Sequence, residues 1–138
     1  MPRKPQPGGV VFEPRSLADN PKKFGRTSTQ LATGPMETPH QAAAELQHAV
    51  ANRIREHLLD QNTNIRTFCA TNELPPGLSE DRSQRLLRGE TMITITDMLF
   101  WARQIPDLAP FIGATLGQLT DPETTDSWRS PAPQEGGA

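Results

Sequence analysis

The feature that most constrains this sequence is the stretch 79–105, where two amphipathic helical patterns follow one another with a glycine between them. Small and apolar residues recur on one side of the first pattern: Ser83, Leu86 and Leu87. The other side is polar and holds Asp81, Gln84, Arg85 and Arg88. Ser79 is a favoured N-cap, and Gly89 tolerates the left-handed conformation that ends helices. The stretch predicts a short helix that is attached through one edge and exposes arginines.

A longer helix is predicted directly after this one. Thr94 can cap its start, and apolar residues then follow the i, i+3, i+4, i+7 spacing of a buried stripe. The stripe consists of Ile95, Met98, Leu99, Ala102 and Ile105. Pro106 closes the helix. The large aromatic residues nearby are expected in the core or at its edge: Phe100, Trp101 and Phe111.

Three further helices are predicted around this pair. A capping box with proline at the first helical position is formed by Thr38, Pro39 and Gln41. That helix should run to about residue 60. The polar stretch 62–64 ends it, and Thr63 or Asn64 caps the next helix. Residues 108–119 favour a fifth, weaker helix, so the chain is expected to be all-α.

This succession resembles the helix-turn-helix domain of the Cro and lambda-repressor family, also called the XRE family. Its members carry a recognition helix, an Arg/Asn-Gly step and a Thr-led apolar helix, which here runs from Thr94 to Ile105. The segment 65–74 resembles the first helix of the motif, with Phe68 and Cys69 at its large apolar and small positions. The resemblance covers residues 50–119 and implies a five-helix lambda-repressor-like domain that binds duplex DNA.

Three features depart from the family pattern. Glu73 stands where the turn glycine is usual, and the turn over 73–78 is about four residues longer, with two prolines that interrupt any helix. The first helix is also extended at its start. Leu46, Ala49 and Val50 continue its apolar stripe there. We expect this extension to pack either against a twofold mate or against the fifth helix of its own chain.

The resemblance also implies which residues contact DNA. In the family, the first two turns of the recognition helix contact bases, which points here to Ser79, Glu80, Asp81, Gln84, Arg85 and Arg88. Gln84 and Arg85 suit adenine and guanine. Arg82 and Arg88 are expected to contact bases or the backbone. The helix start at Thr94 and Thr96 can offer main-chain N–H groups to a phosphate.

Composition divides the chain into three parts. Residues 1–37 hold six basic and three acidic side chains among repeated prolines, and predict a disordered basic arm of net charge +3. Residues 38–121 form the helix-turn-helix domain, with seven arginines against ten acids, and 122–138 form a second disordered tail. The acidic domain is a poor overall match for DNA, but Arg82, Arg85 and Arg88 lie close together.

Several functions find no support in the sequence. No apolar run reaches the length of a membrane span, and the N-terminus lacks the apolar core of a secretion signal, so we expect a cytoplasmic, nucleoid-associated protein. Cys69 has no partner for a disulfide and is expected to be a small buried hydrophobe. His40, His48 and His57 are not spaced as metal ligands. No catalytic motif is present, so no enzyme, metal or cofactor is expected.

The interpretation that follows is a sequence-specific, repressor-like DNA-binding regulator of bacterial or phage origin. A homodimer is expected, since one short helix contacts few bases. One alternative is a protein-interaction adaptor with the same fold, and another is the DNA-binding antitoxin of a toxin–antitoxin pair. The tails are further candidates for binding a protein partner, through the isolated aromatic residues Phe12, Phe24 and Trp128.

Overall fold

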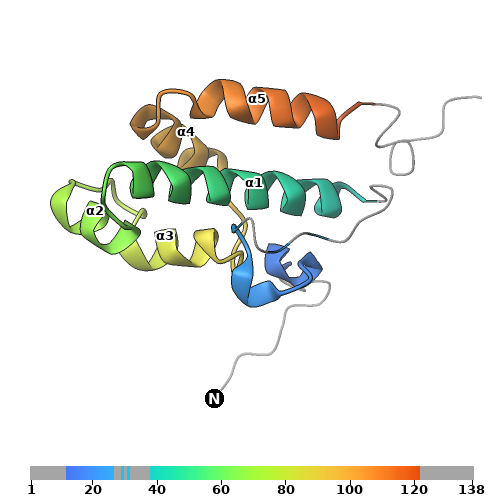
Figure 1. The fold of residues 1–138 in the computed structure, drawn as a ribbon, viewed down its shortest axis with the longest axis horizontal. Coiled ribbons are helices and arrows are strands. Elements are labelled where there is room, and N and C mark those ends of the chain that lie inside the picture. The colour runs from blue at the N-terminus through green and yellow to red at the C-terminus, as the bar shows by residue number, and fades with distance from the viewer. Residues whose placement is uncertain (1–11, 27–28, 30, 32–37, 122–138) are drawn as a thin grey trace, which may run out of the picture.

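A computed structural model of the chain describes residues 12–26, 29, 31 and 38–121. This part contains five α-helices, two short 3-10 helices and no strand beyond an isolated bridge between Ala18 and Leu31 (Figure 1). The α-helices are α1 (Pro39–Asp60), α2 (Ile65–Thr71), α3 (Glu80–Leu87), α4 (Ile95–Gln104) and α5 (Leu108–Leu119). The 3-10 helices are η1 (Pro14–Leu17) and η2 (Pro21–Lys23). The predicted all-α class with five helices is confirmed, whereas the tail 122–138 lies outside the described residues.

Helix α1 is the central element of the fold. Its capping box forms as predicted: the Thr38 hydroxyl accepts from the Gln41 amide at 3.1 Å, and the Gln41 side chain accepts from the Thr38 amide at 2.9 Å. One flank of α1 packs against α5, and other parts contact η1, α2 and α3 (Figure 1). Contacts with so many elements bury a wide face: Ala44, Gln47, Val50, Ala51, Ile54 and Leu58.

The extended start of α1 packs within its own chain. Leu46 is partly buried against the core, and Val50 is fully buried. Helix α1 contacts both η1 and α5, so elements of the same chain cover part of the surface that a twofold mate was also a candidate to cover. The homodimer therefore stays a prediction that rests on other surfaces.

The two short helices α2 and α3 begin where the sequence indicates, and α3 also ends there, whereas α2 ends at Thr71, before the end of the segment 65–74. Asn64 caps α2 by accepting from the Thr67 amide at 2.8 Å, and Ser79 caps α3 by accepting from the Arg82 amide at 3.1 Å. Gly89 ends α3 with φ of +73°, a conformation that residues with a side chain rarely adopt. In the long connection between the helices, Leu78 is buried and anchors the chain to the core.

The expectation of a disordered arm is wrong for residues 12–26. Phe24, a predicted candidate for binding a protein partner, is instead buried in the core at 1% exposure. Phe12 makes an edge contact with the His40 ring, with 5.0 Å between the ring centroids. Two hydrogen bonds attach the segment to the domain: the Arg15 amide donates to the Gly89 carbonyl at 3.0 Å, and the Gly25 amide donates to His48 Nδ1 at 2.9 Å. Residues 1–11, 27–28, 30, 32–37 and Trp128 lie outside the described part.

The buried stripe predicted for α4 is wrong at Ile95 and Leu99 but confirmed at Ile105, which is 1% exposed. Ile95 and Leu99 are 71% and 62% exposed, although both were expected in the core. The buried side instead holds Asp97, Trp101 and Ile105, which recur every four residues. The reason is that Asp97 forms an ion pair with Arg82 of α3, and this contact turns the wide Trp101 ring into the core.

Candidate nucleic-acid interface

The outer side of α3 is the first part of the candidate interface. The helix is attached through Ser83, Leu86 and Leu87, all buried as predicted, so its opposite side faces solvent. Arg85 and Arg88 are half exposed there. Arg85 lies 4.0 Å from the Asp81 carboxylate, and Arg88 is paired at 2.7 Å with Glu90. Exposed pairs of this kind contribute little stability, so both guanidinium groups can exchange these partners for phosphate or base atoms.

Gln84 lies on the same side of α3 and is half-buried. Its amide nitrogen is 3.4 Å from a Glu80 carboxylate oxygen, at the long limit of a hydrogen bond. Ser79, expected to contact DNA, uses its hydroxyl oxygen as the acceptor of the helix cap. The charges of Glu80 and Asp81 make the first turn of α3 acidic, so its basic character is confined to the C-terminal half.

Arg82, expected from the sequence to contact DNA, has its guanidinium group paired with a carboxylate inside the fold. Its Nε and Nη2 atoms donate to the two carboxylate oxygens of Asp97 at 3.1 and 2.5 Å, and Nη2 also lies 3.4 Å from the Met92 carbonyl. Burial alone would raise the pKa of Asp97, but the hydrogen bonds from Arg82 and Thr94 outweigh it and hold that pKa below its usual value. We therefore assign Arg82 the structural role of joining α3 to α4.

Asp97 also determines the start of α4. Its carboxylate accepts from the Thr94 amide at 2.8 Å and from the Thr94 hydroxyl at 2.9 Å, while its own amide donates to that hydroxyl. The main-chain N–H of Thr94 is therefore used inside the fold. The amides of Ile95 and Thr96 belong to the first helical turn, which offers no carbonyl to them, and Thr96 is exposed. Only this part of the predicted phosphate contact is geometrically available.

The N-terminal segment adds basic residues that sequence reasoning had placed in a disordered arm. Phe24 is buried directly against Gly89, so the flanking residues Lys22, Lys23 and Arg26 lie at the C-terminal end of α3 and are exposed. Charges in this region act on one another. Burial first, and then Arg26 and Arg88, lower the pKa of Arg55 to about 10. We call Arg26, Arg55 and Arg88 the arginine cluster.

Gln47 lies beneath the α3 surface and forms hydrogen bonds to the connection that follows α3. The only sign of this role in the sequence is a polar residue within an apolar stripe. The Gln47 side-chain nitrogen donates to the carbonyls of Leu86 and Thr91 at 2.9 and 2.8 Å. Its oxygen accepts from the Ile93 amide at 2.7 Å. Gln47 is fully buried and thereby fixes the connection between α3 and α4 to the central helix.

Neither a metal centre nor a membrane span is found in the described part of the chain. No group of three or more His, Cys, Asp or Glu residues in these ranges is arranged to hold a metal ion. No helix there combines the length and the apolar character needed to cross a bilayer. Burial raises the pKa of the half-buried Cys69 thiol, which lowers the fraction of thiolate at neutral pH.

Comparison with known proteins gives no further assignment. The chain matches no protein-family model, no curated protein and no solved structure.

Proposed function

We propose that this protein is a sequence-specific DNA-binding regulator that inserts α3 into the major groove, as in the Cro and lambda-repressor family. The observation that supports this most is the exposed C-terminal half of α3 with Arg85 and Arg88, next to which Phe24 holds the basic N-terminal segment against Gly89. A helix held by one buried edge can enter a groove, and adjacent cations attract phosphates on both sides of it.

The charges support a local rather than a global attraction to DNA. The chain has a formal net charge of −2, and its acidic residues are spread over several helices. The N-terminal segment offsets this at the end of α3, because three basic residues are held there by a folded contact rather than by a loose arm. A confined basic surface on an acidic protein orients DNA toward that surface and away from the rest.

Each exposed residue of α3 has a chemically distinct contribution in this proposal. Arg85 can form a bidentate bond with guanine, and Gln84 can do so with adenine. Asp81 can accept from a cytosine amino group, whereas Arg88 is placed for the backbone. The Thr96 amide can donate to a phosphate at the start of α4. Because α3 has eight residues and few bases fit along it, we propose a homodimer on a pseudo-palindromic site.

The experiment that tests the proposal is selection of bound duplexes from a random pool, followed by titration of the recovered sequence at several salt concentrations. We expect a recurrent sequence and an affinity that falls steeply with salt. Recovery of no preferred sequence, or an affinity indifferent to salt, would refute a specific DNA-binding function.

A second candidate is supported by the outer side of α4. Ile95 and Leu99 are one helical turn apart and mostly exposed, which is unusual for two large apolar residues. This pair suits a protein adaptor or an antitoxin, in which α4 would contact a protein partner. Leu99→Ser distinguishes the candidates: it should abolish partner binding in an adaptor, yet leave binding to a selected duplex unchanged.

A further inference from the structure

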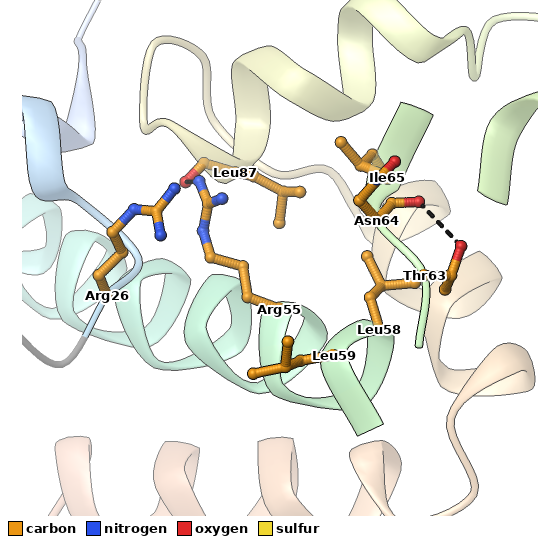
Figure 2. A pocket seen from close by; sticks show the side chains of 8 residues that line it. All are labelled: Arg26, Arg55, Leu58, Leu59, Thr63, Asn64, Ile65 and Leu87. Carbon is orange, nitrogen blue, oxygen red and sulfur yellow. Dashed lines mark hydrogen bonds between the residues drawn. The ribbon is translucent and has the colours of Figure 1, made fainter. Parts of the chain in front are cut away.

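A cavity of about 230 Å³ lies where the C-terminal half of α1 meets the beginning of α2 and the end of α3 (Figure 2). Its walls are mainly apolar and include Leu58, Leu59, Ile65 and Leu87, while Thr63 and Asn64 add two polar residues. Arg26 and Arg55 lie together at one end, next to the Leu87 carbonyl (Figure 2). The cavity therefore combines an apolar body with a cationic end.

The two cations have no acidic counterpart in the described ranges of the chain. Neither Arg26 nor Arg55 forms an ion pair there with an aspartate or glutamate. Arg55 donates from Nη2 to the Leu87 carbonyl at 3.0 Å, but its Nε is buried without a hydrogen-bond partner among these residues. A buried donor beside a like charge is costly unless an anion compensates both.

The pKa of Arg55 gives an independent sign of this imbalance. Burial and the nearby charges of Arg26 and Arg88 lower it to about 10, whereas an acidic partner would act in the opposite direction. Arg55 nevertheless remains a cation at neutral pH. The end of the cavity is thus permanently positive and only partly solvated.

We propose that this cavity binds a small organic anion, whose carboxylate or phosphate group lies at Arg26 and Arg55 and whose short apolar body contacts Leu59 and its neighbours. Guanidinium groups suit both anions because their donors match paired oxygens. The volume is below the 300–1,000 Å³ typical of drug-sized ligands, so the body must be short. Leu59 is 74% exposed, which leaves an apolar surface at the edge for the ligand to cover.

Such a ligand would act on DNA binding, a consequence that rests on the proposed function. Arg26 belongs to the basic surface at the end of α3, and Arg88 lies near enough to affect Arg55. An anion at the cavity would neutralise part of the charge that attracts phosphates. The bound ligand is therefore expected to weaken DNA binding, as a small effector does in a repressor.

The test is a titration of the full chain followed by methyl NMR, with hexanoate, hexyl phosphate, hexanol and inorganic phosphate as probes. We expect saturable shifts of the Leu58, Leu59, Ile65 and Leu87 methyl groups with both hexyl anions, and tighter binding of these than of inorganic phosphate. Whichever hexyl anion binds more tightly identifies the preferred head group. Hexanol binding as tightly as hexanoate, inorganic phosphate binding as tightly as hexyl phosphate, or the absence of saturable shifts would overturn the proposal.

Matched variants assign the binding to this cavity. Arg26→Gln, at an exposed position, should raise the dissociation constant of hexanoate roughly tenfold, as loss of one charge-assisted contact does. Leu59→Ser should weaken the binding of hexanoate while leaving the binding of inorganic phosphate unchanged. Arg103→Gln and Leu116→Ser, two exposed positions elsewhere, are the controls. Equal losses in the controls would contradict the site. No DNA is present, so failure here is distinguishable from failure of the DNA-binding proposal.

Discussion

The ring of Phe24 lies directly against Gly89, so close that a Cβ at position 89 would come within 2.7 Å of it. This contact joins residues 65 positions apart in the sequence and brings the basic N-terminal segment to the end of α3. Gly89 thus has two roles, because its positive φ ends α3 and its missing side chain admits Phe24. The candidate DNA surface depends on both.

Gly89→Ala is expected to lower the free energy of unfolding by about 2 kcal/mol, since a left-handed conformation costs an L-residue roughly 1–2 kcal/mol and the new methyl overlaps Phe24. Chemical denaturation measures this. The matched control is Gly77→Ala, because Gly77 also has a positive φ, of +89°, but no neighbouring side chain stands within 4 Å of an added Cβ. That change carries only the conformational cost and should destabilise the protein less than Gly89→Ala. Equal losses of stability in the two variants would contradict the Phe24 contact.

Arg82→Ala is expected to destabilise the fold by about 3 kcal/mol, the lower end for breaking a buried ion pair, because it leaves the Asp97 carboxylate unpaired and 1% exposed. Thermal or chemical unfolding at neutral pH measures the loss. Arg85→Ala, one helical turn away from the pair, is the control and should leave stability nearly unchanged. If Arg82→Ala retained full stability, α4 would be oriented by something other than this ion pair.

The helix boundaries were predictable from the sequence because their causes are local. Thr38, Asn64 and Ser79 each accept from an amide three residues later, and Gly89 needs only its own φ. The apolar side of α3 was equally predictable from the sequence, since a short helix with one buried edge shows it directly in its residue spacing.

The errors arose where a distant residue decides the outcome. The spacing of Ile95 and Leu99 suggests a buried stripe, but the pairing of Asp97 with Arg82 turns α4 so that Trp101 enters the core. Phe24 lies in a proline-rich stretch that gives no sign of a binding surface beside Gly89. The cavity with Arg26 and Arg55 at one end was missed for the same reason, because its lining residues come from four separate segments.

Acidification should weaken the attachment of the N-terminal segment. The pKa of His48 is held below its usual value of 6.5, mainly by burial, against opposing effects of Glu45 and of a hydrogen bond with the Thr29 backbone. The unfolded chain therefore binds the proton more readily than the folded one. The contribution of neutral His48 to the free energy of unfolding is fully present above pH 6.5. It falls as the pH drops from there through the folded-state pKa.

His48→Asn tests this dependence, because an asparagine oxygen can accept from the Gly25 amide without titrating. Unfolding measured between pH 7.5 and about 5 should show a smaller loss of stability in this variant than in the parent chain. The same substitution at His57, further along α1, serves as the control. If acidification destabilised the His48→Asn variant as much as the parent chain, a group other than His48 would be responsible for the pH dependence.

Lys22→Gln combined with Lys23→Gln is expected to weaken binding to all duplexes without changing the preferred sequence. Two lost phosphate contacts should reduce the slope of log affinity against log salt by about 2, since each contributes roughly 0.9. Titrations of a selected and an unrelated duplex at several salt concentrations measure this. A change in the preferred sequence would mean that the segment contacts bases.

The affinity of Arg85→Ala for a duplex selected by the parent protein tests whether α3 contacts DNA bases, with Arg103→Ala as the matched control. Arg85 is half exposed on α3, and within the described ranges its side chain has only a long 4.0 Å pair with Asp81, so its truncation should leave the fold intact. We expect Arg85→Ala to lose roughly 1–3 kcal/mol of binding free energy for the specific duplex, the range for a bidentate base contact, and Arg103→Ala to lose none. Unchanged affinity of a folded Arg85→Ala variant would contradict the assignment of α3 as the helix that contacts DNA bases.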